Sequence, residues 1–342
     1  MVDLWTRWHA ATVIASSMVA AGCAVVSSPA EPPILVNLAD PAPADTAQLA
    51  AASDIADRLT APVMINAQGP YNFVVDTGAN RTVVSTELAQ ALALPSAGRA
   101  QIHGIAGVEP APTALVARLD IGRVTSRRLR APTLSRERLG ADGLMGVDVL
   151  KNRRVTMDFR RNSLSISKAD DDRIETLQNV SDSRLRGAQA GAAGNNVVVV
   201  EARYRFGQLI IIDADMGGVP VTAFLDSGSQ NTVGNLKLHE QLAGASDAFR
   251  PQISVVELIS ATGQRARGEL SPVPPLRMGG LSVGNLTAVF ADLHIFKLWE
   301  LNDRPAILVG IDVMRHFEAI ELDFGHRQVR FHTPPRSARR PN

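Results

Sequence analysis

The alternation of apolar and polar residues predicts β-strands in two separate parts of the chain. In the first part, residues 62–66 alternate as a strand, residues 68–70 form a turn, and residues 71–76 return. In the second part, residues 209–213 and 219–226 repeat this pattern. Each part is therefore predicted to contain a hairpin whose second strand ends at an aspartate.

The two parts stay in step after these hairpins. The matching segments, including a short helical stretch in each part, are 81–85 with 231–235, 87–92 with 236–242, 119–122 with 276–279, 143–150 with 307–314, and 155–159 with 320–324. Similar segments in the same order indicate an internal repeat. We therefore predict a mostly all-β fold: two similar lobes, related by a pseudo-twofold axis, with a few short helices.

The N-terminal residues predict export. Residues 10–21 contain few polar side chains, and a stretch of this length is typical of a signal-peptide core and too short to span a bilayer. The segment Ala-Ala-Gly-Cys that ends at Cys23 resembles the lipobox of bacterial lipoproteins, in which the cysteine is acylated. We expect a lipid-anchored protein of the bacterial cell envelope. Secreted, periplasmic, uncleaved-anchor and cytoplasmic forms stay open as alternatives.

Local composition divides the remaining chain. Residues 24–57 are rich in Ala, Pro, Ser and Asp, as expected of a tether, and residues 170–196 contain charged and then Gly- and Ala-rich stretches. The predicted segments are a signal peptide with lipobox (1–23), a tether (24–57), lobe 1 (58–168), a connector (169–206), lobe 2 (207–334) and a tail (335–342). Residues 197–201 are expected to add a strand that bridges the lobes.

Overall composition excludes several classes of function. The chain of 342 residues is 45% hydrophobic and 20% charged, which is ordinary for a soluble globular protein. Its net charge of +1 gives no reason to expect a nucleic-acid partner. The seven histidines lack metal-ligand spacing and there is one cysteine, so we expect neither a metal nor a cofactor.

An aspartate follows an apolar run in each lobe. The two tripeptides are Asp76-Thr77-Gly78 and Asp226-Ser227-Gly228, and their aspartates are 150 positions apart (226 − 76). A carboxylate at the end of a buried strand is costly to desolvate unless it is hydrogen-bonded or used. Two of them in matching contexts predict a pair of carboxylates brought together as an acid–acid dyad.

The residues beside these aspartates suit such a pair. The hydroxyls of Thr77 and Ser227 can bond across the pseudo-twofold axis, and Gly78 and Gly228 permit close backbone approach. Ser229 stands where the first lobe has an alanine, and its hydroxyl is predicted to donate to the second aspartate. A donor to the charged form lowers a carboxyl pKa, so the second aspartate is expected to ionise more readily.

A second element follows in each lobe and ends at Gly146 or Gly310. These glycines lack a Cβ, which lets another backbone pass close by. Asp148 and Asp312 come two residues later. We expect each to cap the short helix that begins there, with a structural ion pair as the alternative.

These motifs resemble those of the retropepsin/pepsin clan of aspartic proteases, and in particular bacterial retropepsin-like proteins with two protease repeats in one chain. The resemblance covers residues 59–331. It implies an aspartic endopeptidase in which Asp76 and Asp226 share a proton and activate a water molecule on a polypeptide substrate. No metal and no covalent intermediate is implied.

The resemblance also implies where substrate lies, namely as an extended strand between the lobes and beneath two flaps, at residues 102–107 and 258–264. Neither flap contains the tyrosine of the pepsin flap. His103 is expected to be a solvated loop residue. The predicted substrate contacts are Gly104, Ile105, Ala261 and Thr262 in the flaps and Asn80, Arg81, Gln230 and Asn231 after the catalytic loops. For the last four, simple loop stabilisation is the alternative.

Two other functional hypotheses remain at this point. The chain could be an envelope peptide-binding or scaffolding protein that kept the fold without turnover, although two intact Asp loops argue against this. Alternatively, each lobe could pair with its twin in another chain. The two loops are not identical, and this favours pairing within one chain, as a pseudo-dimeric monomer.

Overall fold

The computed structural model describes residues 34–36, 44–46, 49–51, 58–169, 197–205, 207–245 and 254–334. The predicted signal peptide with Cys23, most of the connector and the C-terminal tail lie outside these ranges. Strands dominate the described elements, which confirms the mostly all-β prediction. Within these ranges, no helix combines the length and apolar character needed to cross a membrane.

The first hairpin consists of β4 (Thr60–Ile65) and β5 (Gln68–Val75). Its turn lies at Asn66 and Ala67, whose φ angles are 49° and 65°, so residues 68–70 belong to β5 and not to the predicted turn. Two central residues with positive φ match the right-handed twist of the flanking strands. The hairpin is therefore confirmed, with its turn placed slightly earlier.

The sheet of lobe 1 closes on itself. Its order is β1-β7-β8-β4-β5-β10-β6-β9, and β8 also pairs with β9. The strands not yet introduced are β1 (Ile34–Val36), β6 (Val83–Ser85), β7 (Ser96–Gly104), β8 (Gly107–Ile121), β9 (Val124–Leu134) and β10 (Gly143–Met145). Closure leaves β7 and β1 outside the closed ring, and β1 is the end strand.

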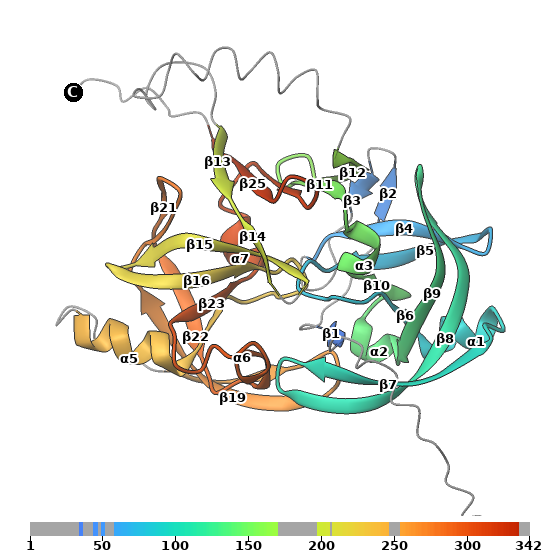
Figure 1. Cartoon of the computed structure of the whole chain (residues 1–342), viewed down its shortest axis with the longest axis horizontal. Coiled ribbons are helices and arrows are strands. Elements are labelled where there is room, and N and C mark those ends of the chain that lie inside the picture. Colours follow the sequence, from blue (N-terminus) through green and yellow to red (C-terminus); the bar gives the residue numbers. More distant parts are fainter. Residues whose placement is uncertain are drawn as a thin grey trace, which may run out of the picture. The chain divides into compact units, whose positions relative to one another are not determined.

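The sheet of lobe 2 has the order β18-β19-β22-β17-β23-β16-β15-β20-β21, and β14 (Arg203–Arg205) pairs with β15. Its other strands are β15 (Gln208–Met216), β16 (Val219–Leu225), β17 (Val233–Gly234), β18 (Ser254–Ile259), β19 (Arg265–Val273), β20 (Leu276–Met278), β21 (Leu281–Val283), β22 (Leu286–Phe290) and β23 (Ala306–Val309). Figure 1 shows these strands in yellow to red, grouped apart from the blue and green strands of lobe 1.

The central strands of the two lobes pair in the same way. In lobe 1, β10 is parallel to β5 and antiparallel to β6. In lobe 2, β23 is parallel to β16 and antiparallel to β17. These matching arrangements confirm the internal repeat that the sequence predicts.

Short helices follow the Asp loops at the predicted places. The helix α1 (Thr86–Ala91) begins after Ser85, whose hydroxyl accepts the N–H of Leu88 at 3.1 Å. The helix α5 (Leu236–Ala245) begins after Asn235, whose amide oxygen accepts the N–H of Leu238 at 2.9 Å. Such caps satisfy N–H groups that have no partner within the helix. The other helices among the described residues are α2 (Arg136–Leu139), α3 (Val147–Leu150), α6 (His294–Leu298) and α7 (Ile311–Met314).

A third sheet is shared by the two halves of the chain. Its order is β13-β25-β24-β11-β12-β3-β2, and β11 pairs antiparallel with β24. The strands are β2 (Ala44–Thr46), β3 (Leu49–Ala51), β11 (Arg153–Asp158), β12 (Ser163–Lys168), β13 (Val197–Glu201), β24 (Ala319–Asp323) and β25 (Gln328–His332). The strand predicted at 197–201 is present, and the segment predicted as a tether contributes β1, β2 and β3.

A buried ion pair links the halves across this sheet. Arg154 on β11 is 8% exposed, and its guanidinium bonds to the fully buried carboxylate of Asp323 on β24 at 2.9 Å and to Glu321 at 3.1 Å. A buried carboxylate that loses its cationic partner is strongly destabilising. The pair therefore holds the lobes together where the sheet crosses between them.

We predict that Arg154→Ala lowers the free energy of unfolding by about 3 kcal/mol, because the negative charge of the buried Asp323 carboxylate then loses its nearest cationic partner. Chemical denaturation monitored by circular dichroism measures this. Arg160→Ala is the matched control, since Arg160 also pairs across the halves, with Glu318 at 2.6 Å, but its side chain is 67% exposed. It should cost less than about 1 kcal/mol. Equal losses in the two variants would contradict the prediction.

Candidate active site

The two aspartates lie at the ends of equivalent buried strands. Asp76 follows β5 and donates its N–H to the carbonyl oxygen of Met145 at 3.0 Å, and Asp226 follows β16 and donates to Val309 at 3.0 Å. Both residues are 0% exposed. The parallel pairing of each strand thus continues to the aspartate and fixes the position of its carboxylate.

The structure brings the two carboxyl groups into contact. A Cβ added at Gly78 would overlap the carboxylate of Asp226, and one added at Gly228 would overlap that of Asp76. The two carboxyl groups are also hydrogen-bonded to each other. Only glycine leaves room for this arrangement, so the sequence-predicted pairing of the aspartates and the need for both glycines are explained together.

Hydrogen bonds between the loops hold this contact. The N–H of Thr77 donates to the hydroxyl of Ser227 at 3.1 Å, and the N–H of Ser227 donates to the hydroxyl of Thr77 at 3.0 Å. Each hydroxyl also donates into the opposite strand, Thr77 to Leu225 at 2.8 Å and Ser227 to Val75 at 2.7 Å. The predicted link across the pseudo-twofold axis is confirmed, and both loops are fixed by it.

Backbone donors surround each carboxylate. The N–H groups of Gly78 and Ala79 both donate to Oδ1 of Asp76 at 2.8 Å. The N–H of Gly228 donates to Oδ1 of Asp226 at 3.0 Å, and the N–H of Ser229 also bonds to this carboxylate. These donors hold the carboxylates in place without any charged side chain.

The prediction for Ser229 is wrong. Its hydroxyl donates to the carbonyl oxygen of Asn231 at 2.8 Å, because the loop folds back over two residues, and only its backbone N–H reaches the carboxylate. Burial, and then the negative charge of Asp76, raise the pKa of Asp226 well above its ordinary value. The two carboxyl groups titrate as one coupled pair, so this raised pKa belongs to the proton that the pair shares, and the expected readier ionisation of Asp226 stays a prediction.

Each Asp loop is braced by a Thr–Asp pair. In lobe 1, the N–H and hydroxyl of Thr82 donate to Oδ1 of Asp148 at 2.9 and 2.7 Å, while the N–H of Gly146 donates to the Thr82 hydroxyl at 3.2 Å. A Cβ at Gly146 would also overlap the backbone of Arg81. The predicted close approach of backbone at this glycine is confirmed.

Lobe 2 repeats the brace with Thr232, Asp312 and Gly310. The N-cap residues of α3 and α7 are the two glycines, and neither cap has a side-chain hydrogen bond. Neither aspartate is therefore the N-cap residue, but Oδ1 of Asp312 accepts the N–H of Val313 in the first turn of α7 at 2.8 Å, so the predicted bond from this carboxylate to the start of its helix is present in lobe 2. Burial raises the pKa of both carboxyl groups, and the threonines oppose this shift.

Gln208 is a contact that the sequence did not predict. Its side-chain amide, on the first strand of lobe 2, donates to the carbonyl oxygen of Gly78 at 2.8 Å, and the residue is 2% exposed. This bond joins the second lobe to the first Asp loop. No local pattern marks Gln208, because its partner lies 130 residues away.

The tip of the first flap, between β7 and β8, is buried in lobe 2. Ile105 is 1% exposed and belongs to a hydrophobic cluster of lobe 2 that includes Phe296. Its carbonyl oxygen accepts the N–H of Ile295 at 3.4 Å, and the side chain of Gln264 donates to the carbonyl oxygen of Val108 at 2.9 Å. The first flap is thus closed against the opposite lobe.

The tip of the second flap, between β18 and β19, is buried in lobe 1. Ala261 is fully buried in a cluster of lobe 1, and the hydroxyls of Ser260 and Thr262 are 2.8 Å apart. A Cβ at Gly104 would overlap both hydroxyls. The four predicted flap residues therefore lie at the two flap tips, each of which packs against the opposite lobe.

Two histidines stack where the first flap meets α6. The rings of His103 and His294 are 5.2 Å apart between centroids, and Nδ1 of the first is 2.9 Å from Nε2 of the second. Burial, and then the charge of its partner, lower the pKa of His103. Burial, and then Lys297, lower the pKa of His294. The expectation that His103 is a solvated loop residue is wrong.

A cavity of about 450 Å³ lies beside the second Asp loop. Gln230 and Asn231 line it together with residues of the second flap and of α2, including Ser260 and Arg138. The half-buried Asn80 and Arg81 do not line this cavity. Of the four predicted loop contacts, the structure therefore places the two from lobe 2 at an open cavity.

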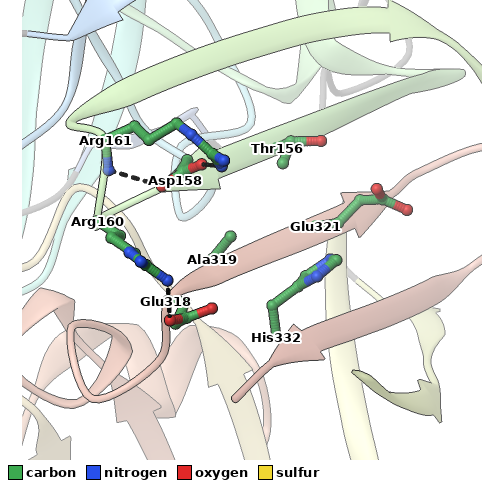
Figure 2. Close-up of a pocket in the computed structure, with 8 residues that line it drawn as sticks. All are labelled: Thr156, Asp158, Arg160, Arg161, Glu318, Ala319, Glu321 and His332. Carbon is green, nitrogen blue, oxygen red and sulfur yellow. Dashed lines mark hydrogen bonds and ion pairs between the residues drawn. The ribbon is translucent and has the colours of Figure 1, made fainter. Parts of the chain in front are cut away.

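Another cavity, of about 280 Å³, lies over the shared sheet and is shown in Figure 2. Its rim carries the ion pairs Arg160–Glu318 at 2.6 Å and Arg161–Asp158 at 2.8 Å. None of the predicted site residues lines it. Among the residues that the structure describes, no group of three or more His, Cys, Asp or Glu side chains is arranged to hold a metal ion.

Two family models match the chain in tandem. Residues 61–152 match a family described as "gag-polyprotein putative aspartyl protease", and residues 212–313 match a family described as "Aspartyl protease". Each match includes one Asp loop and the Gly element that follows it. A search of curated proteins found no significant match.

We predict that acid loosens the first flap. Opening the flap exposes His103 and His294 and returns each pKa toward the ordinary value of 6.5, so the open form binds more protons than the closed form. Stabilisation of the closed flap is complete above that value and is lost as the pH falls through the lowered pKa. Hydrogen-exchange protection of Ile105 should therefore decrease between about pH 7.5 and pH 5.

Variants separate this effect from general acid destabilisation. His103→Gln keeps a polar side chain that does not titrate in this range, so the pH dependence of flap protection should become weaker, with only His294 left to titrate. His316→Gln is the control, because the ring of His316 lies against the carbonyl oxygen of Val313, away from the flap. A pH response that persists unchanged in His103→Gln would rule out the histidine pair as its cause.

Proposed function

Because the chain carries two aspartyl-protease family domains in tandem, we propose that it is an aspartic endopeptidase that hydrolyses peptide bonds. The observation that carries this proposal is the contact between the fully buried carboxyl groups of Asp76 and Asp226. The two groups lie in loops that follow equivalent strands of the two lobes, and these loops are hydrogen-bonded to each other through Thr77 and Ser227. Such a pair keeps one proton because two adjacent carboxylates do not both ionise readily.

The proposed mechanism uses the two carboxyl groups in different protonation states. The carboxylate of the pair takes a proton from a water molecule as the water oxygen attacks the scissile carbonyl carbon, while the protonated partner donates a hydrogen bond to the carbonyl oxygen. The roles reverse when the amine leaves. Activity should decrease as the pH rises through the raised pKa of the pair, because the acid is then lost.

Polypeptide substrate is proposed to bind as an extended strand between the flaps and the Asp loops. The flap residues Gly104 and Thr262 would cover its backbone after the tips have parted. Gln230 and Asn231 would contact a substrate side chain in the adjacent cavity of about 450 Å³. This assignment is supported by the position of the cavity beside the second Asp loop.

A monomer is proposed as the working form. The loops bond to each other within one chain, through Thr77 and Ser227, which supports intramolecular pairing over pairing with a twin lobe. The second candidate function, a peptide-binding protein without turnover, is disfavoured by the same loops, since both keep the aspartate, hydroxyl residue and glycine. Cleavage assays with dyad variants separate these two functions.

Export and lipid anchoring through Cys23 are also proposed, on the sequence pattern alone. Acylation of the cysteine would anchor the protein at the bacterial cell envelope, whereas a secreted or periplasmic protein would lack it. The localisation is independent of the chemistry proposed for the dyad.

We predict that Asp76→Asn and Asp226→Asn each lower kcat/KM by at least about 10³-fold, because one amide cannot share the proton on which both steps depend. Mass spectrometry of a digested peptide library measures the loss. Asp120→Asn is the control, since Asp120 pairs with exposed Arg118 at 2.6 Å away from the loops. Retained cleavage in either dyad variant would remove the proposal, and cleavage by no form would favour the peptide-binding function.

We predict that Cys23→Ser abolishes incorporation of an alkyne-labelled fatty acid when the full chain is expressed in a bacterium, because the thiol is the acylated group. Labelling detected by gel fluorescence measures this. Fatty-acid labelling that persists in Cys23→Ser would show that the anchor is elsewhere.

A further inference from the structure

The strand β1 pairs with the edge of β7 in the first flap that β8 leaves open. On one side β7 pairs with β8, and on the other side it pairs in parallel with β1. The register is Ile34 with Ile102, Leu35 with His103, and Val36 with Gly104. An edge strand offers unpaired N–H and C=O groups to any extended peptide, and here residues from the chain's own N-terminal region occupy them.

The docked strand pairs with the part of the flap that meets the opposite lobe. Its partners include His103, whose ring stacks on His294, and Gly104, which packs against the hydroxyls of Ser260 and Thr262. Since β8 occupies the other edge of β7, an extended substrate that pairs its backbone with β7 would use the edge that β1 occupies. The strand β1 and such a substrate would compete for the same backbone groups.

The sequence of this segment suits a short docked strand. The apolar tripeptide Ile-Leu-Val follows two prolines, at positions 32 and 33. Proline has no N–H, so the ladder cannot be extended through donors at those two positions. A run of three residues gives weak intrinsic binding, and the segment depends on its tether for occupancy.

The tether is short because the chain is anchored again soon afterwards. The strand β2 begins at Ala44 and pairs with β3, and β3 pairs with β12 through Ala50–Ser163 and Leu49–Leu164. Only residues 37–43 separate this anchor from β1. A short linker of this kind gives an effective concentration on the order of 1 mM.

We propose, on the basis of the function proposed above, that residues Ile34–Val36 act as an intramolecular competitor that occupies the peptide-docking edge of the first flap. For an intrinsic Kd of about 0.1 mM, a tethered ligand at about 1 mM raises the apparent KM of a competing peptide about tenfold. Displacement of this segment would then activate the enzyme without any change in the dyad.

Leu35→Pro in the full chain tests this, because proline removes a backbone N–H at the centre of β1 and cannot sustain the ladder. Ala30→Pro is the matched control, with the same substitution before the strand. The expected result for Leu35→Pro is an about tenfold lower KM for a fluorogenic peptide with an unchanged kcat, together with faster hydrogen exchange at residues 102–104. Ala30→Pro should leave both readouts unchanged.

A second arm adds a synthetic peptide of residues 31–39 to Leu35→Pro. The peptide should restore protection at residues 102–104 and inhibit competitively. Equal exchange in the two variants would overturn the docking, and faster exchange with an unchanged KM would overturn the competition with substrate. If the exchange results are as expected but no form of the protein cleaves peptide, β1 docks on β7 and the endopeptidase proposal is wrong. The test therefore distinguishes failure of the docking proposal from failure of the proposed function.

Discussion

The hydrogen bonds exchanged by Thr77 and Ser227 are the interaction on which the rest of the site depends. They clamp the ends of two strands so that two carboxyl groups meet in the core, where an unsupported charge would be costly. Each lobe supplies half of the clamp and then braces its own half with a Thr–Asp pair, Thr82 with Asp148 and Thr232 with Asp312. The repeat is therefore a chemical requirement of the site as well as a feature of the fold.

The flaps also connect the two lobes, because the tip of each flap packs against the opposite lobe. Ile105 of the first flap is buried in lobe 2, and Ala261 of the second flap is buried in lobe 1. Each lobe thus holds the cover of the other's half-site, and the dyad is shut off from water in this conformation. Opening the flaps exposes apolar side chains at both tips and therefore costs free energy. We expect flap opening to depend on pH through His103 and on the docked strand β1.

Local chemistry made the dyad, its glycines and the repeat predictable from sequence, because each Asp loop carries its own strand, hydroxyl and glycine. Contacts between distant residues were not predictable in the same way. Gln208 bonds to a loop 130 residues earlier, and His103 meets a histidine 191 residues later. The role of Ser229 was mistaken because the choice between two nearby acceptors depends on how the loop folds, which spacing does not encode.

The shared sheet has a consequence for biogenesis. Its central pair joins β11 from the first half to β24 from the second, so the first half alone leaves the edge of β11 bare, together with half of an ion-pair network. During synthesis, that edge emerges from the ribosome more than a hundred residues before its partner (323 − 158 = 165 between the two strand ends). A nascent chain in this state is open to pairing with other chains, and a chaperone that shields bare strand edges would lower that hazard.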